Sequence, residues 1–151
     1  MSDHSVTLVS VDPHYVPRPE QVMRAEALAW SLFPQADAVS PQLSDGIRLF
    51  DAGSNFESIT CPGCGAQMEL DWWQAAMDAD YNGNGFQLQP RSMPCCNRSY
   101  TLDQLKYDWP QAFGTFGLEL RNPNVGSLPA HAVAVLETAL GTSLKVIYAH
   151  V

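Results

Sequence analysis

Residues 115–120 read TFGLEL and place a large apolar side chain at every second position. Alternation with a period of two is typical of a β-strand that buries one face. A helical pattern follows, which begins near Pro129 and meets Gly141 where a C-terminal cap is expected. Residues 144–151 then alternate again. The C-terminal end of the chain therefore predicts the order β-α-β.

The N-terminal end has the same order of patterns. Residues 6–11 (VTLVSV) predict a buried strand, a helical pattern begins at Pro19, and residues 47–50 (IRLF) predict a second strand. Two such halves resemble the ferredoxin-like split βαβ fold, a four-stranded antiparallel sheet with both helices on one face. The resemblance implies an α+β sandwich formed by residues 1–50 and 114–151.

Residues 51–113 separate the two halves, where a ferredoxin-like fold would need only a hairpin. This stretch contains all four cysteines of the chain, Cys61, Cys64, Cys95 and Cys96, with eight acidic and three basic side chains. We therefore expect an inserted lobe that carries the cysteines and is itself acidic.

The first cysteine pair lies in the sequence CPGCG at residues 61–65. Two thiolates separated by two residues can bind one ion when the backbone between them turns tightly, and proline and glycine favour such a turn. The stretch resembles the CPxCG knuckle of zinc ribbons and treble-clef fingers. The resemblance is confined to the central lobe, and it implies that Cys61 and Cys64 are zinc ligands.

The second pair departs from this pattern, because Cys95 and Cys96 are adjacent. Zinc–sulfur bonds of about 2.3 Å in a tetrahedron place the sulfur atoms about 3.8 Å apart, whereas neighbouring side chains of a strand point to opposite faces. Both cysteines can bind one ion only if the chain bends at Cys95. Pro94 before the pair and a helix start predicted at Thr101 favour this bend.

Four cysteine ligands complete a tetrahedral, structural zinc site with no open position for water. We therefore predict Zn as the cofactor and Cys61, Cys64, Cys95 and Cys96 as its ligands. If only one of the adjacent cysteines binds, a distant residue must complete the site, since every histidine lies outside residues 51–113. Alternatively, some of these cysteines are small apolar core residues.

The sequence contains no phosphate loop, nucleophile elbow or His-Glu-x-x-His motif, and no catalytic residue is predicted. We expect a non-catalytic zinc-binding module that acts through contacts with a protein or a small molecule. The alternative is an enzyme, either a thiol oxidoreductase that uses Cys61 and Cys64 or a catalyst with an open zinc position. Gly65 opposes the helix that would start at a redox-active pair.

The composition restricts the partners and the compartment. With 16 acidic and 8 basic side chains in 151 residues, the net charge of −8 repels phosphate backbones and argues against nucleic acid. No apolar run approaches the roughly 20 residues of a membrane helix, and the N-terminus lacks a signal-peptide pattern, so we expect a cytoplasmic protein. Charged residues make up only 16% of the chain, which leaves neutral surface for self-association.

Residues 78–83 (DADYNG) fit the opening of a calcium-binding loop, with oxygen ligands at alternate positions. The twelfth position of that loop would be Gln89 instead of glutamate, and Pro90 obstructs the helix that should follow. The sequence NGNG at residues 82–85 is typical of a hairpin turn. We therefore interpret this stretch as a polar turn.

Overall fold

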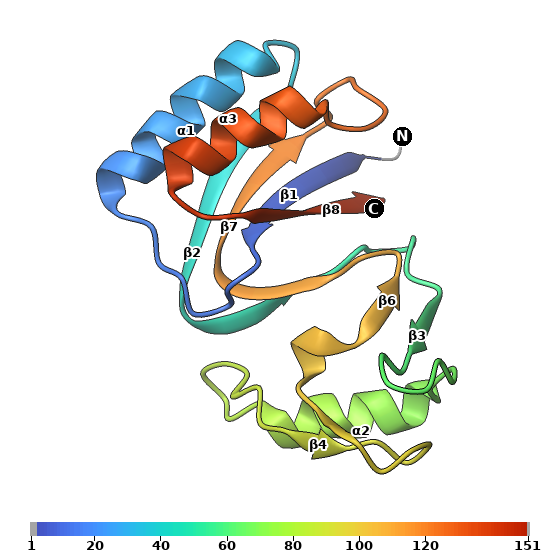
Figure 1. Ribbon diagram of the computed structural model, residues 1–151. Coiled ribbons are helices and arrows are strands. Elements are labelled where there is room, and N and C mark those ends of the chain that lie inside the picture. The colour runs from blue at the N-terminus through green and yellow to red at the C-terminus, as the bar shows by residue number, and fades with distance from the viewer. Residues whose placement is uncertain (1–2, 151) are drawn as a thin grey trace.

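The computed structural model describes residues 3–150 and has the predicted α+β architecture. Its largest sheet is antiparallel, with four strands in the order β2-β7-β1-β8 (Figure 1). The elements are β1 (His4–Ser10), α1 (Pro19–Leu32), β2 (Ala38–Phe50), α2 (Leu70–Asp80), β7 (Ala112–Arg121), α3 (Ala130–Leu140) and β8 (Leu144–His150). Among the helices within residues 3–150, none combines the length and the apolar content that a membrane span requires.

The two central strands, β1 and β7, supply the most buried side chains of this sheet. Leu8 lies opposite Leu118 and Val6 opposite Leu120, and all four side chains belong to one apolar cluster. The alternation of residues 115–120 thus turns the leucines toward a core and the glycine to the other face. The predicted C-terminal strand is also present, although Val151 lies outside the described residues.

Helices α1 and α3 pack against one another over the same face of the sheet (Figure 1). Each has small or branched apolar side chains at helical spacing, including Ala25 and Ala29 in α1 and Leu136 in α3, which are fully or almost fully buried. Gly141 ends α3 with a φ of 75°, the left-handed conformation in which glycine has no steric penalty. Both predicted helices are therefore confirmed.

Strand β2 is much longer than predicted, because it begins at Ala38 rather than near Ile47. The additional part contains Pro41 and several polar residues, and it shows no alternation. β2 is an edge strand, where a proline without an N–H group is tolerated. Its pairing with β7 is irregular between Leu43 and Arg48, so the strand is bent at this point.

Residues 51–111 form smaller elements beyond the ends of β2 and β7, away from α1 and α3 (Figure 1), so the inserted segment ends at Gln111 rather than at Phe113. Strands β3 (Ser58–Thr60) and β6 (Lys106–Asp108) pair with each other, as do β4 (Arg91–Ser92) and β5 (Ser99–Tyr100). Together with α2 they enclose a second apolar cluster. The buried side chains at its centre are Ile59, Met93 and Leu102.

The ends of the long strands contribute to this second cluster. Ile47 of β2 and Phe113 of β7 are buried in it, and the ring of Phe113 lies edge-on to the ring of Phe86. Trp73 of α2 donates a hydrogen bond from its indole N–H to the Tyr107 hydroxyl, 3.1 Å away. Trp72, Trp73, Tyr107 and Phe113 thus belong to the second apolar cluster, whereas Trp109 is exposed.

Two helix starts in this region differ in how well the sequence predicts them. A single turn of 3-10 helix, Leu102–Gln104, follows Thr101, which forms the expected reciprocal cap with Gln104. Helix α2 begins at Leu70 with Glu69 at the N-cap position, where no side-chain hydrogen bond caps the helix. Asp71 lies in the first turn, where its negative charge is favourable next to the helix N-terminus.

The stretch after α2 is a hairpin in which a side-chain oxygen accepts hydrogen bonds from backbone N–H groups. Tyr81 and Phe86 form an antiparallel bridge. The Asn82 side-chain oxygen accepts hydrogen bonds from the N–H groups of Asn84 and Gly85 at 2.9 and 3.0 Å. These contacts support the turn predicted at residues 82–85, whereas Asp78 and Asp80 belong to the end of α2 instead of to a turn.

Candidate metal centre

The four cysteines converge, although 30 residues separate the two pairs in the sequence. All four Sγ atoms lie within 4.8 Å of one another. Cys61 Sγ is 3.8 Å from Cys96 Sγ, and Cys64 Sγ is 3.3 Å from Cys95 Sγ. A tetrahedron of sulfur atoms around zinc has edges of about 3.8 Å, so the four sulfur atoms can surround one ion.

The first pair lies on a tight hairpin turn that follows β3. The backbone N–H of Cys61 donates to the carbonyl of Ala66 at 2.8 Å, and the N–H of Gly65 donates to the carbonyl of Cys61 at 3.0 Å. Gly65 has a φ of 78°, a conformation that favours glycine. The turn therefore needs the glycine that follows Cys64.

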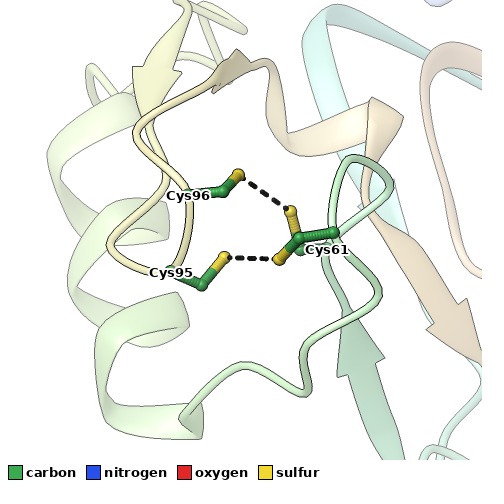
Figure 2. Close-up of side chains that lie close together, drawn as sticks. Cys61, Cys95 and Cys96 are labelled. Atoms are coloured by element: carbon green, nitrogen blue, oxygen red, sulfur yellow. Dashed lines mark hydrogen bonds between the residues drawn. The ribbon is translucent and has the colours of Figure 1, made fainter.

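The second pair lies on the turn between β4 and β5, which has the same hydrogen bonds. The N–H of Met93 donates to the carbonyl of Arg98, and the N–H of Asn97 donates to the carbonyl of Met93, both at 2.8 Å. Asn97 has a φ of 62°. This turn is the bend that lets both Cys95 and Cys96 face the first pair (Figure 2).

The backbone hydrogen bonds of the two hairpins correspond when the second is shifted by 32 residues, so that Cys61 corresponds to Met93. Pro94 then matches Pro62, and Cys96 matches Cys64. Even the strand pairing agrees, because Thr60 pairs with Gln67 as Ser92 pairs with Ser99.

This correspondence between the hairpins explains why Cys95 and Cys96 are adjacent, and it is not among the predictions made from the sequence. Met93 occupies the position of the first cysteine of the motif, and Cys95 occupies the position of Gly63. The signal that reveals it is the recurrence of Pro-x-Cys at Pro62 and at Pro94. A search restricted to cysteine spacing does not find this repeat.

The four cysteines differ strongly in exposure. Cys61 is completely buried in the second apolar cluster, and Cys96 is half-buried against the same cluster. Cys64 and Cys95 are exposed. The cluster therefore has an inner pair, Cys61 and Cys96, and an outer pair, Cys64 and Cys95.

Without a bound ion, the surroundings favour the ionised form of Cys61 and the protonated form of Cys95. Burial raises the pKa of Cys61, but hydrogen bonds from the backbone N–H groups of Cys64 and Gly63 and from the thiols of Cys95 and Cys96 lower it to about 7. The adjacent Cys64 sulfur, together with burial, raises the pKa of Cys95 to about 12.

One cationic side chain lies beside the cluster. The Arg98 guanidinium donates a hydrogen bond from Nη1 to the Gly63 carbonyl at 3.3 Å. The Tyr100 hydroxyl, followed by the negative charge of Cys96 and Cys61, raises the pKa of Arg98. This arginine therefore offsets part of the negative charge that ionised cysteines create.

The donor set is suited to a soft or borderline metal ion. Four thiolates in tetrahedral arrangement are typical of zinc and of iron–sulfur sites, and hard ions such as calcium and magnesium prefer oxygen ligands. Among residues 3–150, the cysteines are the only group of three or more Cys, His, Asp or Glu side chains whose ligand atoms converge. The four cysteines could thus hold a metal ion without a histidine.

Comparison of the chain with models of protein families, with curated proteins and with solved structures finds no match.

Proposed function

We propose that the protein is a non-catalytic zinc-binding module whose structural zinc is held by Cys61, Cys64, Cys95 and Cys96. The convergence of four sulfur atoms from two hairpins carries this proposal. With four thiolates on one ion, no position remains for a water molecule, so the zinc would stabilise the fold instead of acting on a substrate.

The proposed architecture is a ferredoxin-like base, residues 1–50 and 112–151, with a zinc-binding lobe inserted at residues 51–111. The antiparallel order β2-β7-β1-β8 and the location of both α1 and α3 on one face support the ferredoxin-like assignment. The two equivalent hairpins support a zinc-knuckle lobe of the zinc-ribbon type. The separate apolar cluster of this segment supports its treatment as a lobe.

The proposed role of the module is contact with a protein or a small molecule in the cytoplasm. Four thiolates and one zinc carry a net charge of about −2 and add to the acidity of the chain, which disfavours nucleic acid as the partner. Free thiols that serve as metal ligands are typical of a reducing compartment.

Metal analysis of protein purified under reducing conditions, without chelators, tests the proposal. We expect one zinc ion per chain. After replacement of zinc by cobalt, we expect the intense thiolate-to-metal absorption and the visible bands of a tetrahedral site, because all four ligands are sulfur. Protein that contains no metal and does not take up zinc would contradict the proposal, and an octahedral cobalt spectrum would contradict the ligand set.

The affinity for zinc should fall as the pH falls, because the metal displaces protons from the thiols. Above pH 7 the Cys61 thiol is already largely ionised, whereas Cys95 must lose its proton on binding. Below about pH 7, Cys61 must lose a proton as well, so the plot of log affinity against pH should steepen by one proton there. Competition with a chromophoric chelator between pH 6 and pH 8 measures this slope, and a constant slope would contradict the lowered pKa of Cys61.

A further inference from the structure

Cys95 is the one cysteine that reaches the cluster from an unusual position in its hairpin. In the first turn, Cys61 and Cys64 occupy the first and fourth positions. In the second turn, these two positions are Met93 and Cys96. Met93 is 1% exposed and belongs to the apolar cluster. The fourth sulfur therefore comes from the middle of the turn instead of from its first residue.

The surroundings of this middle position differ between the two hairpins. In the first hairpin it is Gly63, which lies under the side chains of Tyr100 and Arg98: an added Cβ would meet the Tyr100 hydroxyl at 2.5 Å. In the second hairpin it is Cys95, whose Sγ contacts Met68 Sδ at 3.8 Å and Cys64 Sγ at 3.3 Å. Both outer cysteines are exposed, but Tyr100 and Arg98 cover the middle position of the first turn, whereas Cys95 itself occupies the middle position of the second.

We propose that Cys95 is the exchangeable ligand of the zinc site and the point at which small disulfides, such as glutathione disulfide, modify the protein. The inference rests on the proposed zinc function. In the first step the Cys95 thiolate attacks one sulfur of glutathione disulfide; a protein–glutathione disulfide forms, the disulfide bond of the reagent breaks and one glutathione thiolate leaves. The other three cysteines still hold the ion.

The second step involves the outer pair. The Cys64 thiolate attacks the Cys95 sulfur of the mixed disulfide, so that the Cys64–Cys95 disulfide forms and a second glutathione thiolate leaves. Two protein thiolates are oxidised and one glutathione disulfide is reduced to two thiolates. The zinc ion retains only Cys61 and Cys96 as ligands and is released.

Treatment of the zinc-loaded protein with glutathione disulfide tests this assignment, with mass-spectrometric mapping of the adduct and a zinc indicator in the same sample. We expect the first adduct on Cys95, followed by the Cys64–Cys95 disulfide and release of zinc. The informative variant is M93C/C95S, which moves the fourth thiol to the regular position. We expect it to bind one zinc and to react at least about tenfold more slowly, whereas C95S alone should bind zinc more weakly than either.

Each other outcome has a defined meaning. Zinc-loaded protein that is modified first on Cys64, Cys61 or Cys96 overturns the inference and leaves the proposed function intact. M93C/C95S protein that binds no zinc, or that binds zinc and reacts as fast as the original chain, also overturns it. Protein without zinc before the disulfide is added overturns the proposed function, and with it this inference.

Discussion

If zinc occupies the four cysteines as proposed, its removal is expected to unfold residues 51–111 while the four-stranded sheet stays folded. The strands of this segment are only two or three residues long, and its apolar cluster includes the buried Cys61 side chain. A structural zinc contributes about 10–16 kcal/mol to the folding of a small zinc-binding unit, which exceeds what such short elements supply on their own.

The four-stranded sheet, α1 and α3 should stay folded because their apolar cluster contains no cysteine. This cluster is formed by α1, α3 and the sheet, with Leu8, Leu118 and Leu136 fully buried. Hydrogen exchange with and without a strong chelator measures the difference: amides of β3 to β6 should lose protection, and those of β1 and β7 should keep it.

Two controls belong to this experiment. Re-addition of zinc to the chelated protein should restore protection, which excludes irreversible damage. The C61S variant should resemble the chelated protein, since it removes the one cysteine of the cluster that is completely buried. Protection in β3 to β6 that survives chelation would show that the apolar cluster alone holds this segment together.

Replacement of Asp80 by alanine should destabilise the protein by about 3–5 kcal/mol, because it leaves several buried groups without their partner. Asp80 is 2% exposed, and its side chain is fully buried. Its Oδ2 accepts hydrogen bonds from the N–H groups of Gln87 and Leu88 at 2.9 and 2.8 Å, and its Oδ1 accepts one from Gln89 at 2.9 Å. Arg91 Nη2 lies 3.5 Å from the same Oδ1.

The contacts of Asp80 also hold an unusual backbone conformation. Leu88 has a φ of 53°, which is unfavourable for a branched side chain, and its N–H is one of the donors to Asp80. Without the carboxylate, we expect the loop to relax toward ordinary backbone angles. The loss should appear in chemical denaturation as a lower midpoint of the transition that reports on α2.

Asp78 provides a matched control for this substitution. It is an aspartate of the same helix, two residues earlier, and it is exposed. D78A should change the free energy of unfolding by less than about 0.5 kcal/mol, as is usual for surface positions. If D80A were as stable as D78A, the network of Asp80 would contribute nothing measurable, and the account of this loop would be wrong.

The sequence predicts the sheet and helices of the base well where periodicity is strong. Phe116, Leu118 and Leu120 alternate because they face the apolar cluster under α1 and α3, although Thr115 and Gly117 on the other face of β7 are buried as well. Helix α1 begins at Pro19 as expected. The first part of β2 was missed because an edge strand that contains Pro41 and polar residues has neither alternation nor an apolar run. Pairing with β7, which the local sequence does not encode, makes it a strand.

The candidate site is predictable in part, for similar reasons. Cys61 and Cys64 stand in a local motif whose proline and glycines specify the turn, so short-range sequence suffices. Cys95 and Cys96 lie beside this pair only because the two hairpins approach each other. No local sequence pattern predicts that approach. The repeated Pro-x-Cys is a weak sequence signal for the origin of the adjacent pair, and the matching hydrogen bonds establish that Met93 takes the place of a cysteine.

The chain leaves the large sheet at Phe50 and returns at Ala112, and these two residues are direct partners in the β2–β7 ladder. Everything between them therefore occupies the place of a single reverse turn. The length of that excursion can change during evolution, or in an engineered chimera, without altering the alignment of any strand in the sheet. A replacement for the cysteine-bearing excursion would need to cover Ile47 and Phe113, the two side chains of the long strands that are buried in its cluster.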